Sequence, residues 1–338
     1  MLNDEMYMRR CLELARLGEY EVAPNPMVGA VLVLNDRIIG EGWHHRFGEP
    51  HAEVETFRSV DRAKYPSCAE ATLYVSLEPC SHYGKTPPCV NLILKEGVRR
   101  VVVGCLDPNP LVSGKGVAIL REAGVEVEVG VLQSECRELN KRFLCLHEKH
   151  RPYVILKWAQ TADGYIGYTP EQVTARGQRL QISTPTTKQI VHKMRAENMA
   201  IMVGTNTALQ DNPRLLTTHW TGRNPIRVVL DRHHRLPADS QVLSDEAQTI
   251  VYQENTDWEF VLKDLAQRQI HSVMVEGGRT LLQAIIDSGV YDEVHVEVSP
   301  VLAHEGVKAP EVVLPDGACQ VIEGHRLYVW KHYSSGQE

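Results

Sequence analysis

Alternation between apolar strand patterns and helical patterns is the feature that most constrains the fold of this chain. Apolar runs typical of buried strands lie at 27–34, 71–77 and 98–105, and helical patterns lie at 51–60 and 116–123. Buried strands separated by helices indicate one sheet with both faces covered. The first part of the chain is therefore predicted to be a three-layer α/β/α domain.

A break near residue 150 divides the chain. The charged helical pattern over 132–150 ends at Arg151-Pro152, because the residue before a proline disfavours helical backbone. Beyond that point the alternation of strands and helices restarts. We therefore predict two domains, residues 1–147 and 150–338, the second also of α/β class. A length of 338 residues agrees with two domains at roughly 150 residues each.

Charge and cysteine content exclude several classes of function. Lys and Arg number 36 against 43 Asp and Glu, a net charge of −7, so we expect no nucleic-acid partner held by phosphate contacts. No apolar run approaches the roughly 18 residues of a membrane span, and the polar N-terminus does not resemble a secretory signal. We therefore expect a cytoplasmic protein without a membrane partner, whose eight cysteines are thiols or metal ligands.

Three residues have the types and spacing of a catalytic zinc site: His51, Cys80 and Cys89. One imidazole and two thiolates can hold Zn²⁺ and leave its fourth position open to water, whose pKa falls on binding. Glu53, two residues after His51, can take the proton of that water and pass it to a leaving amine. The H-x-E … P-C … C arrangement is that of zinc deaminases. The alternatives are a structural zinc site closed by a fourth ligand such as His82, or two buried thiols without metal.

Around this motif the chain resembles one family, the bifunctional riboflavin-biosynthesis deaminase–reductases. The insertion between the two cysteines is characteristic, because most other nucleoside and tRNA deaminases have only two residues there. The resemblance covers nearly the whole chain. The matching stretches are 24–29, 48–53, 77–89, 107–110, 157–164, 195–212 and 275–280.

The resemblance implies a cytidine-deaminase-like first domain and a dihydrofolate-reductase-like second domain. The first would use Zn²⁺ to remove an amino group hydrolytically from 2,5-diamino-6-ribosylamino-4(3H)-pyrimidinone 5′-phosphate. The second would use NADPH to reduce the ribosyl group of 5-amino-6-(5-phosphoribosylamino)uracil to a ribityl chain. The implied partner is a small phosphorylated pyrimidine, and the implied assembly is a homo-oligomer, a dimer formed through the reductase domain.

The ligand-contacting positions of the family map onto residues of both domains. The deaminase substrate positions form a polar set that suits a heterocycle and a phosphate; they are Asn25, His44, His82 and Lys85. Two of these have simpler interpretations, since His44 could face solvent beside His45 and Lys85 could be a solvated loop charge. The NADPH positions are Ala159, Thr207, Asp211 and Gly278, and the reductase substrate positions are Arg195, Leu215 and Glu276.

The residues of the second domain define its chemistry less clearly than the zinc motif does. The segments 203–207 and 275–280 both read as a strand, a glycine turn and the start of a helix, which would let a phosphate approach the backbone. The full G-x-G-x-x-G pattern is absent, so a Rossmann domain is not supported.

Three departures from the family bear on the reductase. Gln181 stands where the family has tryptophan, and Lys188 and Thr218 stand where it has arginine. A threonine cannot replace the guanidinium fork that holds a phosphate. Either phosphate binding is weakened or another residue compensates; the candidates are Arg179, Arg214 and His219. Arg179 and Lys188 are therefore added to the candidate substrate residues. The alternative function is a deaminase whose reductase-like domain is slow or non-catalytic.

Overall fold

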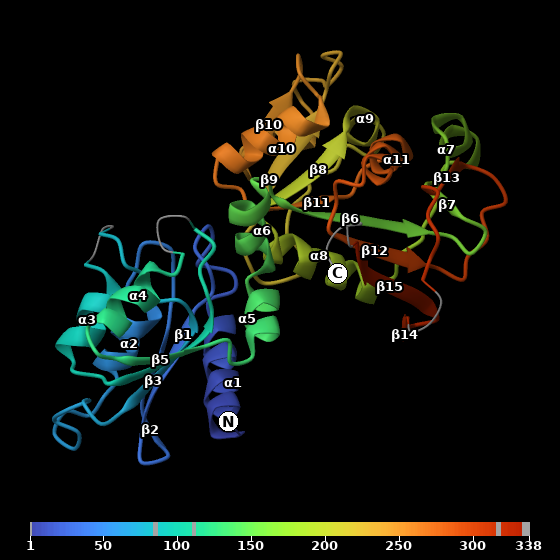
Figure 1. The fold of residues 1–338 in the computed structure, drawn as a ribbon. Coiled ribbons are helices and arrows are strands. Elements are labelled where there is room, and N and C mark those ends of the chain that lie inside the picture. Colours follow the sequence, from blue (N-terminus) through green and yellow to red (C-terminus); the bar gives the residue numbers. More distant parts are fainter. Residues whose placement is uncertain (1, 84–86, 110–112, 316–318, 333–338) are drawn as a thin grey trace. The chain divides into compact units, whose positions relative to one another are not determined.

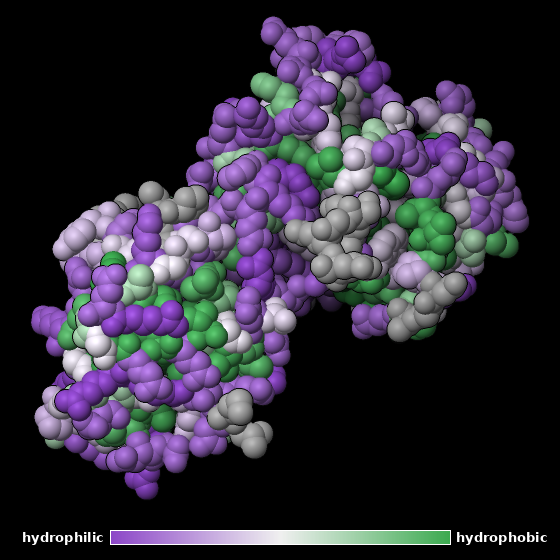
Figure 2. Space-filling model, in the orientation of Figure 1, coloured by the Kyte–Doolittle hydropathy of each residue, from purple (hydrophilic) through white to green (hydrophobic). Residues whose placement is uncertain are grey.

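The computed structural model describes residues 2–83, 87–109, 113–315 and 319–332, and the chain divides into two compact units, 1–150 and 151–338 (Figure 1). Each unit has its own β-sheet and its own hydrophobic core. Hydrophilic residues cover most of the visible surface, with hydrophobic residues gathered in patches on each unit (Figure 2). Within the described ranges, no helix combines the length and the apolar character that crossing a bilayer requires.

The first unit contains a five-stranded sheet in the order β2-β1-β3-β4-β5. The strand β1 pairs antiparallel with β2 and β3, whereas β3, β4 and β5 are parallel. The strands are β1 (Gly29–Leu34), β2 (Arg37–Trp43), β3 (Thr72–Leu77), β4 (Arg100–Cys105) and β5 (Glu126–Val129). The helices are α1 (Leu2–Arg16), α2 (Ala52–Arg58), α3 (Cys89–Lys95), α4 (Lys115–Glu122), α5 (Gln133–Leu139) and α6 (Lys141–Lys149).

Successive side chains of these strands point alternately into two cores, one on each face of the sheet. Leu32 and Val75 pack with residues of α2, α3 and α4, whereas Val31 and Tyr74 pack with residues of α1, α5 and α6. The first unit is therefore the predicted three-layer α/β/α arrangement.

The helical pattern over 132–150 forms two helices rather than one. They meet at Asn140, whose side-chain amide accepts a hydrogen bond from the Met27 backbone N–H and donates one to the Met27 carbonyl, both at 2.8 Å. The prediction of a single helix is wrong because this side chain binds the backbone of a distant segment, a contact that periodicity does not reveal.

The second unit contains an eight-stranded sheet in the order β10-β9-β8-β11-β6-β12-β15-β14. The first six strands in this order are parallel to one another. The strand β15 pairs antiparallel with β12 and with β14. These strands are β6 (Tyr153–Gln160), β8 (Ala200–Gly204), β9 (Ile226–Leu230), β10 (Thr249–Tyr252), β11 (Ser272–Val275), β12 (Glu293–Val298), β14 (Gln320–Ile322) and β15 (His325–Lys331). A separate two-stranded sheet pairs β7 (Tyr165–Gly167) with β13 (Val307–Lys308).

The helices of the second unit are α7 (Pro170–Arg176), α8 (Pro185–Glu197), α9 (Thr205–Asp211), α10 (Trp258–Gln267) and α11 (Arg279–Ser288), with a 3-10 turn at Gln241–Leu243. Residues of α10 and α11 pack with the central strands in one core. The helix α9 begins directly after the carboxyl end of β8, and α11 begins after a three-residue turn that follows the carboxyl end of β11. In open α/β sheets, ligands bind at this edge.

Candidate active sites

His51, Cys80 and Cys89 meet at one point of the first unit. His51 directly precedes α2, Cys89 begins α3, and Cys80 follows β3. His51 Nδ1 lies 3.5 Å from Cys80 Sγ and 3.4 Å from Cys89 Sγ, and the three ligand atoms lie within 4.8 Å of one another. One nitrogen and two sulfur donors are a ligand set for zinc that leaves a fourth position for water. The residues present therefore fit the metal that their types predicted.

The hydrogen bonds of this cluster favour a thiolate at Cys80. The Cys89 thiol and the His51 imidazole both hydrogen-bond to the Cys80 sulfur and lower the pKa of Cys80 to about 4. The Cys89 backbone N–H also donates to Cys80 Sγ, at 3.2 Å. The contact with Cys80 and burial together raise the pKa of the Cys89 thiol. Because thiolates are the metal-binding form, Cys80 is already prepared as a ligand.

Glu53 lies in the first turn of α2, two residues after His51, and is only 3% exposed. Burial raises the pKa of its carboxyl group, which hydrogen-bonds with the Cys89 thiol. It is not part of the ligand group. A buried carboxyl group with a raised pKa beside a metal site is suited to take up and release a proton.

Asn25 and His44 form a hydrogen-bonded pair beside His51. His44 Nδ1 lies 3.0 Å from the Pro50 carbonyl oxygen and must donate to it, so His44 Nε2 must accept from Asn25 Nδ2, also at 3.0 Å. Burial lowers the pKa of His44, which favours this neutral form. The His44 ring packs edge-on against the His51 ring at 5.6 Å between centroids. His44 is therefore buried, and the alternative of a solvent-facing residue is wrong.

The other two predicted substrate residues of this unit are placed less clearly. His82 follows Cys80 in a loop and is exposed. It is not part of the three-residue ligand group, so the geometry gives no support to a structural zinc site closed by His82. Lys85 lies outside the described residues.

Glu78, two residues before Cys80, supports the segment that carries this ligand. The sequence analysis did not identify Glu78 as a site residue. Its buried carboxylate accepts hydrogen bonds from the backbone N–H groups of Asp107, Gly114 and Val117, at 3.3, 2.9 and 3.2 Å. A Cβ atom on Gly116 would lie 2.2 Å from the Pro79 carbonyl oxygen. The start of α4 is therefore packed directly on the segment that carries Cys80. The sequence signal that could have identified Glu78 is its position directly before Pro79-Cys80.

A cavity of about 1070 Å³ lies at the carboxyl ends of the parallel strands of the second unit. All four predicted NADPH positions line it, namely Ala159, Thr207, Asp211 and Gly278. Three of the five predicted substrate residues also line it, namely Arg179, Lys188 and Glu276. The other two, Arg195 and Leu215, are not among the lining residues, although Arg195 binds the lining residue Glu276.

The two glycine turns predicted separately from the sequence meet at this cavity. A Cβ atom on Gly277 would lie 2.7 Å from Val203 Cα, so only glycine permits this approach of the two turns. Gly278 has a positive φ of 54°, and its Cβ position would be 3.1 Å from Thr207 Oγ1. The backbone of both turns is therefore open to a ligand at the starts of α9 and α11.

A group of partly buried charged residues lies at the cavity, of which Glu276 and Lys157 line it. Arg195 binds Glu276 through two contacts, Nη2 to Oε2 at 2.8 Å and Nε to Oε1 at 3.4 Å, and also donates to the Leu216 carbonyl at 3.0 Å. Lys157 lines the cavity near Glu276, and burial lowers the pKa of its ammonium group. The sequence analysis did not select Lys157 as a site residue. Its position inside an apolar run of β6 was the sequence signal that could have identified it.

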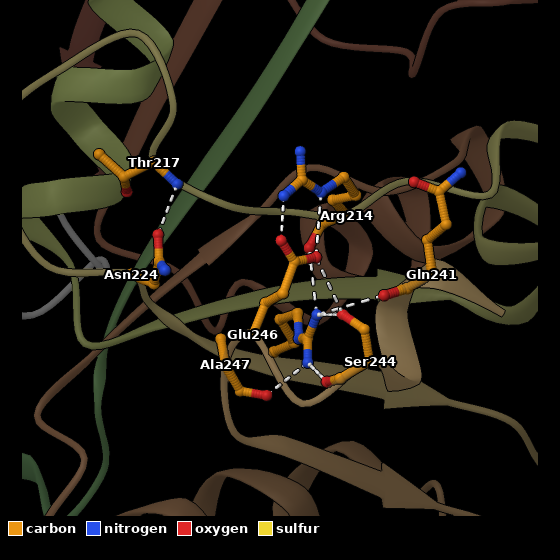
Figure 3. A network of polar contacts seen from close by, with 8 residues as sticks. Arg214, Thr217, Asn224, Gln241, Ser244, Glu246 and Ala247 are labelled. Carbon is orange, nitrogen blue, oxygen red and sulfur yellow. Dashed lines mark hydrogen bonds and ion pairs between the residues drawn. The ribbon is translucent and has the colours of Figure 1, made fainter.

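The structure distinguishes the three residues proposed to compensate for Thr218. Arg214 is paired with Glu246 (Figure 3), Nε to Oε2 at 3.0 Å. The His219 ring packs edge-on against the His192 ring at 4.6 Å, and Thr218 donates its backbone N–H to His192 Nδ1 at 2.9 Å. Only Arg179, of these three, lines the cavity.

A buried guanidinium group supports the loop that carries Glu246. Arg227 of β9 is fully buried and donates to the backbone carbonyls of Gln241, Ser244 and Ala247. It also donates to the Arg214 carbonyl at 3.4 Å. In the same network, Thr217 donates its backbone N–H to Asn224 Oδ1 at 2.9 Å. This network holds the segment from Arg214 to Thr217 in place. Neither of its two arginines, Arg214 and Arg227, lines the cavity.

Family models match both units. The model of the cytidine and deoxycytidylate deaminase zinc-binding region matches residues 1–105, and the RibD C-terminal domain model matches residues 152–313. The riboflavin biosynthesis protein RibD of Aquifex aeolicus is 40% identical, with 90% of this chain and 89% of that protein aligned. RibD of Escherichia coli is 36% identical, with 89% of each chain aligned.

Two solved structures agree with this result. The diaminohydroxyphosphoribosylaminopyrimidine deaminase/5-amino-6-(5-phosphoribosylamino)uracil reductase of Thermotoga maritima is 37% identical, with a TM-score of 0.87 over 98% of this chain and 99% of that chain. RibD of Acinetobacter baumannii is 33% identical, with a TM-score of 0.87 over 98% and 99%. These matches confirm the predicted fold of both units and do not favour a non-catalytic second unit. The chain belongs to the RibD family, the bifunctional deaminase–reductases of riboflavin biosynthesis, which use Zn²⁺ and NADPH.

Proposed function

We propose that residues 1–147 carry the deaminase and residues 150–338 the reductase. The deaminase substrate would be 2,5-diamino-6-ribosylamino-4(3H)-pyrimidinone 5′-phosphate, and its product would pass to the reductase as 5-amino-6-(5-phosphoribosylamino)uracil. The observation that carries this proposal is the convergence of His51, Cys80 and Cys89 beside the buried carboxyl group of Glu53. The cavity in the second unit, with its paired glycine turns, supports the second half.

In the deaminase, His51, Cys80 and Cys89 would hold the zinc ion, which when bound makes hydroxide available at neutral pH. Glu53 takes up one proton from water and delivers it to the leaving amine, so that water and the amino group become a carbonyl and ammonia. The neutral His44 fixes the amide of Asn25, whose carbonyl oxygen can then accept from the pyrimidine. His82 and Lys85 are proposed substrate contacts on the basis of the family resemblance.

In the reductase, NADPH when bound supplies a hydride to the ribosyl carbon. Thr207 and Gly278 line the cavity at the starts of α9 and α11, where the cofactor's phosphates would bind, and Ala159 and Asp211 line the same cavity. Arg195 holds the carboxylate of Glu276 toward the substrate.

Phosphate binding in the reductase is assigned to residues other than Thr218. Arg179 and Lys188 both line the cavity and supply positive charge for the substrate phosphate. Leu215 is buried and has a positive φ of 54°, and it is a proposed substrate residue on the basis of the family resemblance. Arg179 is also ion-paired with Asp211 at 3.3 Å, so Lys188 is the cation of this pair that we propose first as the replacement for the family's arginine at Thr218.

We also propose a cytoplasmic homo-oligomer that pairs through the reductase unit and has no nucleic-acid partner. The strand β14 lies at the edge of the eight-stranded sheet, and Val321 and Val329 of β14 and β15 are more than half exposed. Exposed apolar side chains at a sheet edge are typical of an association surface. Sedimentation of the intact chain tests this proposal, and a Val321→Lys variant should dissociate such a dimer.

An assay of metal-replete protein with both substrates, with and without NADPH, tests the whole assignment. We expect ammonia release without NADPH, and NADPH oxidation only when the deaminated substrate is present. Ammonia release without any NADPH oxidation would instead support a deaminase with a non-catalytic second unit.

A further inference from the structure

Behind the wall of the reductase cavity, one buried carboxylate connects the cavity lining to the C-terminal strand. Glu297 of β12 is 3% exposed and accepts a hydrogen bond from Ser183 Oγ at 2.6 Å. Its other oxygen, Oε1, lies 2.7 Å from His325 Nδ1. Ser183 lines the cavity, whereas His325 begins β15 and is almost fully buried. A cavity residue and a residue of the C-terminal hairpin therefore bind the same side chain.

Sheet geometry places Glu297 on the face that carries cavity residues. Lys157 and Ala159 are two positions apart in β6 and therefore point to the same face, and both line the cavity. Glu297 is the register partner of Ala159. Because partners on neighbouring strands share a face, Glu297 lies on the same face as Lys157, with which it interacts electrostatically.

The turn between β14 and β15 makes a second connection to the same segment. Glu323 in this turn accepts a hydrogen bond from Thr186 Oγ1 at 2.8 Å, in the first turn of α8. Ser183 lies two residues before that helix begins. The hairpin therefore holds the Ser183 segment twice, and it lies beyond the residues 152–313 that the RibD C-terminal domain model matches.

The chemistry of a buried carboxylate explains why His325 is needed. An ionised carboxylate only accepts hydrogen bonds, and burying it is costly unless donors surround it. Ser183 has one proton to donate, and His325 Nδ1 supplies a second donor from outside the cavity. Without His325, Glu297 would lose this donor and would compete for the Lys157 ammonium group instead, which would rearrange the cavity lining.

We propose that His325 is a positioning residue of the reductase. It orients Glu297, and through Glu297 it holds Ser183 and Lys157 in the arrangement that the reaction requires, without touching a ligand itself. This inference rests on the proposed assignment of the reductase to residues 150–338.

Three substitutions at one position and one matched control test the proposal. His325→Asn keeps an amide N–H near the position of Nδ1, His325→Gln places it near the position of Nε2, and His325→Leu removes it. The control is His295→Leu. His295 Nε2 also contacts a buried carboxylate of β12, Glu293, at 2.5 Å, but the second oxygen of that carboxylate accepts from Tyr153 Oη at 2.8 Å, and Tyr153 does not line the cavity.

The reductase kcat should follow the position of the donor. His325→Leu and His325→Gln are expected to lose about 10- to 100-fold in kcat, the range for loss of a hydrogen bond to a charged group. His325→Asn and His295→Leu should stay near the wild-type kcat. Ammonia release should be unchanged in all four variants, and the Kd for NADPH from fluorescence titration should be unchanged.

Two results would overturn the proposal. One is a wild-type kcat in His325→Gln, which keeps the size and polarity of the side chain and therefore remains informative if His325→Leu does not fold. The other is a loss of kcat in His325→Asn and His295→Leu as large as that in His325→Leu. The loss of kcat would then reflect a general loss of protein stability and not the loss of the donor at Nδ1. Absence of NADPH oxidation by the wild-type chain would instead overturn the proposed function, and the inference with it.

Discussion

The carboxylate of Glu78 accepts the backbone N–H of Gly114 at 2.9 Å, and it also binds the N–H groups of Asp107 and Val117. This side chain therefore joins the start of α4 to the segment that carries the ligand Cys80. A glutamine can place only one acceptor oxygen among these three donors. We expect Glu78→Gln to lower the free energy of unfolding by about 1–3 kcal/mol.

The same substitution should reduce ammonia release, because the Cys80 segment loses its support. Urea unfolding and an ammonia assay on metal-replete protein measure the two effects. Glu70→Gln is the matched control, since Glu70 is exposed and its pair with Arg99 is on the surface. Wild-type stability in Glu78→Gln would show that these three hydrogen bonds do not support the site.

The orientation of the Asn25 side chain depends on the neutral state of His44, because only neutral His44 can accept the amide N–H of Asn25 at Nε2. Asn25→Ala leaves this nitrogen without its donor and removes a polar contact proposed for the pyrimidine. We expect the deaminase KM to rise about tenfold or more, as for the loss of one such hydrogen bond. Zinc content per chain should not change, because Asn25 is not a ligand. A wild-type KM would contradict the role proposed for Asn25.

Metal removal should destabilise the first unit alone. Zinc held by His51, Cys80 and Cys89 binds the folded state and not the unfolded chain, so it raises stability by mass action. We expect a chelator to lower the unfolding temperature of the first unit by about 5 °C or more. Calorimetry with and without chelator should show the transition of the second unit unmoved. Equal shifts of both transitions would argue against a zinc site confined to residues 1–150.

His192 should make the second unit sensitive to acid. Burial lowers the pKa of His192 to about 4, from an ordinary value of 6.5. Between these values the unfolded chain binds a proton that the folded chain does not, so stability falls as pH is lowered from about 6.5 to about 4. In His192→Asn, the amide oxygen can still accept from the Thr218 backbone N–H, but it does not titrate.

The urea midpoint of the second unit of His192→Asn should therefore depend less on pH than that of the wild type over this interval. The other titrating groups are the same in both proteins and provide the internal control. Parallel curves for the two proteins would mean that His192 does not titrate with a lowered pKa.

Much of this architecture could be predicted from the sequence, because strand and helix periodicities are local properties. The alternation over 27–123 led to the three-layer unit, and the spacing of His51, Cys80 and Cys89 led to the ligand cluster. The break at Asn140 could not be predicted, because its cause is a contact with Met27, more than a hundred residues away in the sequence.

The missed site residues share a physical reason. Glu78 and Lys157 are charged groups in or beside apolar strands, and Glu297 occupies a polar position of an alternating strand, so the roles of all three depend on partners brought together by the sheet. Periodicity treats the first two as exceptions to an apolar pattern and the third as an ordinary solvent-facing position. Their partners come from other elements, as Gly114 does for Glu78 and His325 does for Glu297, and no spacing in the sequence indicates these pairs.

The most direct test of the central claim is ammonia release by Glu53→Gln, measured on protein with one zinc ion per chain. Glu53 is buried beside the ligands without being one, so the variant should keep its metal and its ability to oxidise NADPH with the deaminated substrate. Ammonia release should fall by about 100-fold or more, as expected for loss of a general acid–base group. Wild-type ammonia release from zinc-replete Glu53→Gln would contradict the account.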